Sequence, residues 1–229
     1  MKNPDFSRVK ELYLSKKEAF DAFGALLREY NQRYNLTRIT SEEETKYKHF
    51  YDSLAGEYFF PAGERVCEVG SGGGFPSIPL KIVRDDLKFT LVESTGKKCE
   101  FLKVAVRELG LKNVEVVHAR AEEIAREKNY REAFDLCCAR AVARLNTLCE
   151  YCMPFVKKGG LFLAYKGDAA EEIEEAASAV KILGGKGIES VSYELEKGYG
   201  ARTLVAVEKE RATPFLYPRG NGKERTKPL

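Results

Sequence analysis

Four glycines within five residues, Gly70-Ser71-Gly72-Gly73-Gly74, make up the segment of this sequence best suited to hold a ligand. They directly follow a short apolar run, Arg65–Val69, that is typical of a strand, and they precede a helical stretch. Glycine allows positive φ and lets a ligand approach the backbone closely. A loop in this place predicts nucleotide binding at the carboxyl end of the first strand, although alone it is also compatible with a tight surface turn.

Two acidic residues frame this loop and narrow the choice of ligand. The dehydrogenase fingerprint G-x-G-x-x-G requires a third glycine where this chain has Phe75. Glu93 ends the second predicted strand, at the distance where an acid commonly binds the hydroxyls of a ribose. Glu68 could bind a ligand ammonium, directly or through water. S-adenosylmethionine has both a ribose and an amino-acid end, so the pattern favours it over a nicotinamide dinucleotide.

Further candidates follow the later strands. In an open α/β sheet, the loop that begins at Ala121 and Glu122 borders the adenine, and its backbone could bond the base edge; acids at a helix N-terminus explain Glu122 equally well. Arg140 ends the fourth strand, where a guanidinium could bond an acceptor of a substrate or a cofactor carboxylate, or simply pair with a nearby acid. Lys166 follows the fifth strand and could neutralise a phosphate. Arg202 precedes the last strand and is a weaker candidate of the same kind.

Helical segments in the N-terminal part add further candidates. Apolar residues at spacings of three and four over residues 5–34 predict one or two amphipathic helices, broken near Ser15. Thr40 or Ser41 can cap a further helix with an acidic first turn. On that helix His49 and Asp52 share a face, where pairing, capping, core packing or chemistry all remain open.

The elements that must position these residues alternate between strand and helix from Arg65 onward, which predicts a parallel sheet covered on both faces. Only Glu196–Arg202 separates the last two strands, so the final strand is expected to run antiparallel. The predicted fold is therefore α/β, with a Rossmann-like, seven-stranded, mostly parallel sheet of the class I methyltransferase type and an N-terminal helical extension. The expected strands are Arg65–Val69, Lys88–Glu93, Val114–His118, Phe134–Ala139, Gly160–Tyr165, Ile188–Leu195 and Thr203–Glu208.

Composition is ordinary for a globular protein of 229 residues, with 44% hydrophobic and 32% charged residues and a net charge of +3. No membrane span or secretory signal is visible, and the six scattered cysteines are expected to be buried reduced thiols in a cytoplasmic protein. The lone pair Cys149 and Cys152 does not predict a metal site. The expected parts are a helical extension over residues 1–62, a cofactor-binding core over 63–209 and a basic tail over 210–229.

The C-terminal residues Lys209–Leu229 carry six basic residues against two acids, a net charge of +4. Prolines and glycines there exclude long regular structure. Basic residues with neighbouring aromatics suit phosphate contact and base stacking, so Arg219, Lys223 and Arg225 are candidates for binding RNA. The alternative is a solvated tail.

The motifs together resemble the bacterial 16S rRNA guanine-N7 methyltransferase family, also called glucose-inhibited division protein B. The resemblance covers nearly the whole chain. Ser77 differs from the family's usual glycine, and Cys67-Glu68 stands where Asp is common. The motifs are Tyr34-Asn35-Leu36-Thr37, His49-Phe50-x-Asp52-Ser53-Leu54, Glu68-Val69-Gly70-Ser71-Gly72-x-Gly74-Phe75-Pro76, Glu93-Ser94-x-x-Lys97-Lys98, Arg120-Ala121-Glu122-Glu123, Arg140-Ala141-Val142-Ala143, Lys166-Gly167 and Thr213-Pro214-x-x-Tyr217-Pro218-Arg219.

The resemblance implies S-adenosylmethionine as cofactor and a guanine in the decoding-region loop of 16S rRNA as substrate, either in free RNA or in the 30S particle, with neither DNA nor membrane as partner. The residues expected at the cofactor, from the motifs and the resemblance together, are Glu68, Gly70, Gly72, Phe75, Glu93, Ser94, Thr95, Ala121, Glu122 and Arg140. Arg140 and Lys166 are expected to position the substrate.

The expected reaction requires no general base, because guanine N7 carries a free lone pair and no proton. Near-attack positioning can by itself lower such a barrier by roughly 7–11 kcal/mol. The sequence lacks the Asn/Asp-Pro-Pro-aromatic motif of exocyclic-amine methyltransferases and the Pro-Cys nucleophile of cytosine-C5 enzymes. A non-catalytic RNA-binding protein, a small-molecule methyltransferase and, least favoured, a dehydrogenase are the alternatives.

Overall fold

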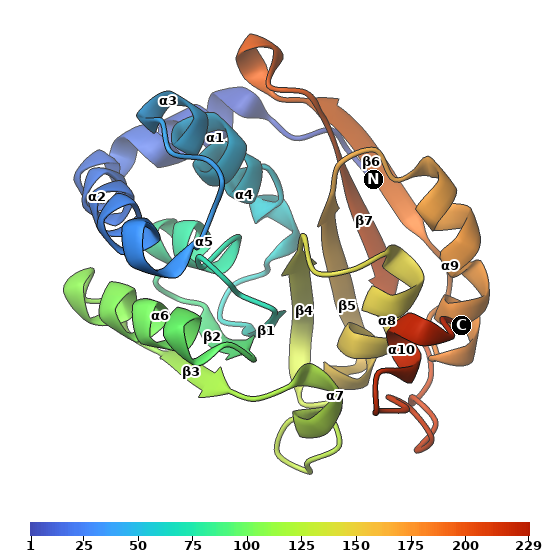
Figure 1. Cartoon of the computed structure of the whole chain (residues 1–229). Coiled ribbons are helices and arrows are strands. Elements are labelled where there is room, and N and C mark those ends of the chain that lie inside the picture. The colour runs from blue at the N-terminus through green and yellow to red at the C-terminus, as the bar shows by residue number, and fades with distance from the viewer.

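The computed structural model describes all 229 residues and contains a seven-stranded sheet in the order β3-β2-β1-β4-β5-β7-β6 (Figure 1). Only β7 runs antiparallel to its neighbours, which confirms the predicted fold class. The order reverses between β1 and β4, the switch point at which open α/β sheets bind ligands. The strands are β1 (Arg65–Val69), β2 (Lys88–Glu93), β3 (Val114–His118), β4 (Phe134–Arg140), β5 (Val156–Lys166), β6 (Glu189–Glu194) and β7 (Ala201–Glu208).

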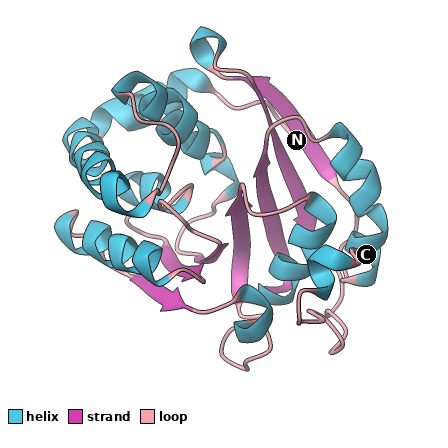
Figure 2. Ribbon diagram, in the orientation of Figure 1, coloured by secondary structure: helices cyan, strands magenta, loops and turns pink.

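Alternation along the strands gives the sheet two apolar faces, each with its own core. Helices lie on both sides of the sheet (Figure 2). Val66 and Leu163 belong to one core, whereas Cys67 and Phe162 belong to the other. The first core is covered by the N-terminal helices with α5 and α6. These are α1 (Phe6–Ser15), α2 (Lys17–Tyr34), α3 (Glu42–Glu44), α4 (Asp52–Ala55), α5 (Ser77–Val83) and α6 (Gly96–Glu108).

Helices on the second face complete the sandwich. They are α7 (Ala121–Ile124), α8 (Leu145–Cys152) and α9 (Ala170–Ile182), and the short C-terminal α10 (Lys223–Thr226) lies beside α8 (Figure 1). Short 3-10 turns η2 (Glu57–Phe59), η3 (Met153–Phe155) and η4 (Glu196–Gly198) link other elements. All six cysteines are buried and free, as expected. None of the helices combines the length and the apolar character needed to cross a membrane.

The N-terminal segment follows the predicted pattern with one departure. The helical region breaks after Ser15, and the Ser41 hydroxyl accepts the Glu44 N–H at 3.2 Å, which identifies Ser41 as the cap. Between α3 and α4 the chain winds as a π-helix, η1 (Thr45–Tyr51), which the sequence pattern does not distinguish from an ordinary α-helix. The π-helical segment carries His49 and ends immediately before Asp52, so it sets the position of both side chains.

Candidate functional site

The glycine loop makes a tight turn directly after β1. Gly70, Gly72 and Gly74 have φ of +71°, +53° and +84°, values that side chains with a Cβ rarely adopt. A Cβ on Gly70 would lie 2.6 Å from Val142 Cγ2, so this position also requires glycine for space. The Gly70 N–H donates to Val92 O at 2.8 Å, which fixes the start of the loop against β2.

Glu93 holds the loop from the end of β2. Its Oε2 accepts the Gly72 N–H at 2.9 Å and its Oε1 accepts the Thr95 N–H at 2.8 Å. The residue is 4% exposed. Each carboxylate oxygen has further lone-pair capacity, so Glu93 can still accept hydroxyl donors from a ligand.

A cavity of about 250 Å³, which we call the loop cavity, opens beside these residues at the carboxyl edge of β1, β2 and β3. Four residues expected at the cofactor line it: Gly70, Ser94, Ala121 and Glu122. Glu93 and Thr95 adjoin it through the hydrogen bonds to the loop and turn, whereas Glu68, Gly72, Phe75 and Arg140 are not among its lining residues. Val69 and Val142, which belong to the motifs, also line it, as do Val92 and Tyr151, which the sequence analysis did not single out.

The donor set of the loop cavity fits the expected S-adenosylmethionine. Gly70 lines the cavity without a Cβ, so a ligand there can approach its backbone closely. Glu93 offers acceptors suited to a ribose diol, and apolar walls beside Ala121 suit a flat base. Glu122, 8% exposed, pairs through Oε1 with Arg120 Nε at 2.7 Å and leaves Oε2 free to accept an exocyclic amine.

Glu68 is fully buried, and neither of its carboxylate oxygens has a hydrogen-bond partner. Burial raises its pKa to about 8. It alternates with Cys67 and Val69, which face the second core, so its side chain points to the opposite face of the sheet, away from the loop cavity. Direct contact between Glu68 and a ligand ammonium in the loop cavity is therefore not part of this arrangement.

Phe75 lies in the first core rather than at the loop cavity. Its ring stacks on His49 with centroids 4.2 Å apart and also contacts Phe23. The Arg140 guanidinium carbon lies 4.8 Å above the same ring. Phe75 thus links the glycine loop to the residues at the end of β4.

A second cavity, of about 320 Å³, contains the three predicted substrate-side cations, Arg140, Lys166 and Arg202. We call it the arginine cavity. His49 and Asp52 also line this cavity. The sequence placed these two residues on one helix face but could not assign them to the site. The ends of β4 and β5, the start of β7 and the π-helical segment thus converge at one place.

Arg140 is held by three groups of the N-terminal helices. Its Nη1 donates to Asp52 Oδ2 at 2.9 Å and to Lys48 O at 3.0 Å, and its Nη2 contacts His49 Nδ1 at 2.8 Å. The side chain is 13% exposed. Arg140 therefore pairs with an acid, Asp52, which was one of the two alternatives kept open by the sequence. It also lines the arginine cavity, so the two alternatives do not exclude each other.

His49 is a neutral acceptor for Arg140. Burial, with the adjacent Arg140 charge, lowers the pKa of His49 to about 3. Because the guanidinium can only donate, Nδ1 must accept, so Nε2 carries the hydrogen and donates to Thr37 Oγ1 at 2.9 Å. Both ring nitrogens are occupied, which leaves His49 no capacity to act as a general base without losing Arg140.

Asp52 joins the two arginines. Its Oδ1 accepts from Tyr193 Oη at 2.9 Å and lies 3.8 Å from Arg202 Nε, while Oδ2 pairs with Arg140. Lys166 is held in the same way by Glu172, 2.6 Å away, and by Ala143 O at 3.0 Å. No sequence pattern pointed to Tyr193 or Glu172, because their roles depend on contacts between distant segments.

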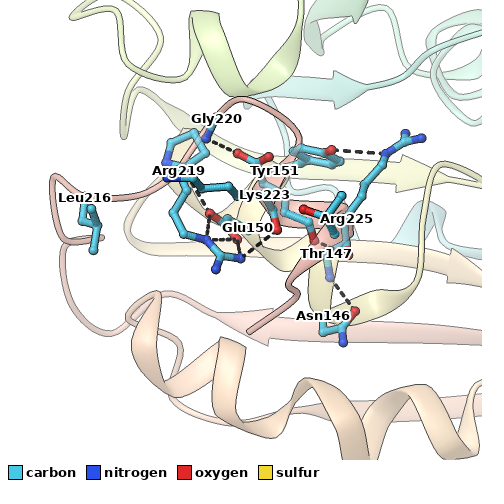
Figure 3. A network of polar contacts seen from close by, with 12 residues as sticks. Asn146, Thr147, Glu150, Tyr151, Leu216, Arg219, Gly220, Lys223 and Arg225 are labelled. Atoms are coloured by element: carbon cyan, nitrogen blue, oxygen red, sulfur yellow. Dashed lines mark hydrogen bonds and ion pairs between the residues drawn. The ribbon is translucent and has the colours of Figure 1, made fainter.

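The C-terminal residues are not a solvated tail. Arg219 pairs in bidentate fashion with Glu150, which is fully buried on α8 (Figure 3). Arg219 is thus part of the packed fold, and its role in RNA binding stays a prediction. Lys223 is exposed. Arg225 donates to Tyr151 Oη at 3.3 Å and lines the loop cavity, a placement that the sequence did not suggest.

Sequence comparisons find relatives of this chain in one protein family. A sequence model of the family described as rRNA small subunit methyltransferase G matches residues 16–198. The chain is 47% identical over 225 residues to the ribosomal RNA small subunit methyltransferase G of Lactobacillus acidophilus, covering 96% of this chain and 93% of the relative. It is 45% identical over 222 residues to the protein of that name from Staphylococcus aureus, covering 96% and 92%.

Solved structures support the fold. The cofactor-bound structure of Rv0187 from MTB aligns with a TM-score of 0.58 at 19% identity, covering 85% of this chain and 91% of that one. Aeropyrum pernix fibrillarin with natively bound S-adenosyl-L-methionine aligns with a TM-score of 0.51 at 14% identity, covering 64% and 66%. At these identities the likeness extends to the fold alone.

Proposed function

The chain belongs to the rRNA small subunit methyltransferase G family, and from this premise we propose that it methylates N7 of a guanine in the decoding-region loop of 16S rRNA. The chain is an S-adenosylmethionine-dependent rRNA methyltransferase. The position of the methyl group on the base, the rRNA loop and the mechanism are the proposed parts. The observation that carries them is the arginine cavity, which holds cations and no free base next to the glycine loop.

The absence of an available base in this cavity matches the chemistry of N7. Guanine N7 attacks through a lone pair, so no proton has to leave before the methyl group is transferred. Among the candidate bases, His49 is neutral with both nitrogens engaged, and Asp52 is bound by Arg140 and Tyr193. The residues therefore suit orientation and desolvation, which are the contributions that an in-line displacement requires.

Cofactor binding is assigned to the loop cavity and its edges. S-adenosylmethionine, when bound, supplies an electrophilic methyl group on a sulfonium centre. Gly70 and Gly72 would let it approach the backbone, Glu93 would accept ribose hydroxyls, and the Ser94-Thr95 turn would close that side. The backbone of Ala121 and Glu122 would contact the base edge.

Substrate binding is assigned to the arginine cavity. Arg140 would donate to the guanine O6, and Asp52 would hold both Arg140 and Arg202 in position for this contact. Lys166, 10% exposed, would act at a phosphate near the cavity mouth. Among the C-terminal candidates, Lys223 and Arg225 are both exposed, as phosphate contact requires. The substrate is 16S rRNA or the 30S particle, in the cytoplasm where ribosomes are assembled.

The test is methyl transfer from labelled cofactor to undermethylated 30S particles and to free 16S rRNA, followed by mapping of the product base. The expected product is a guanine methylated at N7, identified by strand scission after reduction and aniline treatment. Arg140→Lys, which keeps the charge but loses the guanidinium fork, should transfer slowly. Label on an exocyclic nitrogen, or on no RNA, would overturn the proposal.

A further inference from the structure

The C-terminal segment Arg219–Thr226 is fixed to α8 by buried groups (Figure 3). Glu150 Oε1 accepts the Arg219 N–H at 2.8 Å, and Glu150 Oε2 lies 2.7 Å from Arg219 Nη2. Glu150 is fully buried, so separating the pair would leave a charge without a partner in the protein interior. The ion pair therefore anchors the start of the segment.

A second set of contacts fixes the end of the segment. Glu224 is fully buried and accepts the Gly220 N–H, while its backbone carbonyl accepts from Thr147 Oγ1 at 2.8 Å. Gly220 and Gly222 have φ of +77° and +72°, which turn the chain sharply so that α10 lies against α8. This geometry determines where the next residue, Arg225, points.

Arg225 lines the loop cavity together with Gly70 of the glycine loop. Its Nε donates to Tyr151 Oη at 3.3 Å, and its guanidinium carbon lies 6.0 Å from the Tyr151 ring centroid (Figure 3). The terminal nitrogens Nη1 and Nη2 have no hydrogen-bond partner in the protein. Arg225 and Tyr151 line the same cavity as Ala121 and Glu122.

We propose that the segment Arg219–Thr226 forms one wall of the S-adenosylmethionine site and that Arg225 binds the adenine half of the cofactor. This rests on the proposed function, which assigns the loop cavity to that cofactor. Ala121 and Glu122, which border the base, share the cavity with Arg225, whereas Glu93 holds the ribose side. The planar guanidinium with free donors is suited to stack on, or donate to, a ring whose nitrogens accept hydrogen bonds.

One consequence is a reciprocal coupling between cofactor binding and docking of the segment. A cofactor that contacts Arg225 binds only to the protein whose segment is docked, so cofactor binding stabilises docking. By the same linkage, the factor by which the cofactor favours docking equals the factor by which docking raises the affinity for the cofactor. The Arg219–Glu150 pair lies outside the lining of the loop cavity, so it acts on the cofactor only through the segment.

The first test is calorimetric binding of S-adenosylmethionine and S-adenosylhomocysteine to the full-length chain and its variants. Arg225→Ala should weaken both ligands on the order of tenfold, and Arg225→Lys should weaken them nearly as much. Lys227→Ala removes an equal charge two residues away, at an exposed position outside the cavity, and should bind like the unmodified chain.

The outcomes separate this inference from the proposed function. If the unmodified chain binds neither ligand at millimolar concentration, the assignment of the loop cavity fails. If it binds both and Arg225→Ala binds equally well, the wall assignment alone is overturned. If Arg225→Ala loses affinity for 16S rRNA but keeps its affinity for the cofactor, Arg225 binds RNA instead of the cofactor, and the inference is also overturned.

The second test measures hydrogen–deuterium exchange of residues 219–226 with and without S-adenosylhomocysteine. Binding should slow exchange throughout this segment. In Glu150→Gln, which weakens the anchor, the segment should exchange faster without ligand, and affinity for the ligand should fall. Unchanged exchange on ligand binding in the unmodified chain would contradict a wall made by this segment.

Discussion

At the scale of single residues, the site depends on ionisable groups whose burial fixes their charge. Glu68 lies under the carboxyl edge of β1 with no partner for either oxygen, and His49 is held neutral beside a guanidinium. The sequence identified the position of Glu68 but not its environment, because alternation along a strand does not say which face of the sheet borders the cofactor cavity. The burial of Glu68 predicts a specific dependence of the free energy of unfolding on pH.

Glu68→Gln should stabilise the protein increasingly as the pH rises. The unfolded chain releases this proton near pH 4.5, whereas the folded protein retains it to about pH 8. The stability that protonated Glu68 contributes is complete below pH 4.5 and is lost as the pH rises through about 8. We expect the difference in the free energy of unfolding between variant and unmodified chain to grow from pH 5 to pH 9 by on the order of a few kcal/mol.

Urea unfolding at fixed pH values measures this difference. Glu174→Gln, at an exposed position, is the control and should change little between the same pH values. Parallel pH profiles for Glu68→Gln and the unmodified chain would contradict a buried, protonated Glu68.

Asp52 should act through the two arginines that it holds. Asp52→Asn keeps the shape but loses the charge that pairs with Arg140 at 2.9 Å and approaches Arg202 at 3.8 Å. A hydrogen bond to a charged group contributes about 1.5–3 kcal/mol, so kcat/KM for the RNA should fall roughly 10- to 100-fold. The affinity for S-adenosylmethionine, bound in the other cavity, should stay within about twofold.

Single-turnover kinetics with RNA and calorimetry with cofactor separate these effects. Asp21→Asn, on the outer face of α2, is the matched control and should alter neither quantity. If cofactor and RNA affinities fall together, Asp52 has a general structural role instead of a positioning role.

At the scale of the elements, the sequence predicted the strands much better than it predicted the contacts between segments. The bounds of β1, β2 and β3 coincide with the predicted ranges, since short apolar runs between glycines, charges and helical patterns mark them clearly. The π-helical segment Thr45–Tyr51 was missed. Its Lys48 carbonyl accepts from Arg140, a contact across 92 positions of sequence that no local pattern encodes.

At the glycine loop, the cost of a positive φ can be separated from the cost of a steric clash with a neighbouring side chain. Gly70→Ala forces a Cβ to within 2.6 Å of Val142 at a φ of +71°, so it should lower both stability and cofactor affinity. Gly63→Ala is the control, because Gly63 has a φ of +76° but no atom within 4 Å of an added Cβ. It should cost about 1–2 kcal/mol of stability from backbone strain and leave cofactor binding unchanged.

Urea unfolding and cofactor calorimetry of the two variants provide the comparison. A double variant, Gly70→Ala with Val142→Ala, should recover part of the stability, because it removes the contact but not the strain. Equal losses of stability in Gly63→Ala and Gly70→Ala would show that the contact with Val142 adds nothing to the cost of the positive φ.

At the scale of the whole molecule, the expected extension, core and tail are closely joined. Phe20, Phe23 and Leu54 from the N-terminal helices share one apolar core with Val66 and Leu163 from the sheet. The C-terminal segment packs on α8, and its Arg225 lines the loop cavity. Sequence composition suggested separate parts, but the buried contacts that join them involve residues far apart in the chain.

Deletion of residues 1–62 should therefore prevent folding of the remainder. A fully buried Phe or Leu contributes about 1.5–3 kcal/mol, and the deletion removes Phe20, Phe23, Leu27 and Leu54 from one core. Together these match the about 5–15 kcal/mol by which a domain of this kind is stable. The deletion also removes Asp52 and the Lys48 carbonyl from Arg140, leaving a strand-end charge with none of its partners from the N-terminal helices.

Near-UV circular dichroism and thermal unfolding of residues 63–229 test this expectation. We expect no cooperative transition and no fixed aromatic signal, whereas a chain lacking only residues 227–229 should unfold cooperatively. A shortened chain 63–229 that unfolds in one sharp transition and binds S-adenosylmethionine would contradict it. The shared apolar core would then not need the N-terminal helices, and the sheet would have to cover its exposed face by rearranging α5 and α6.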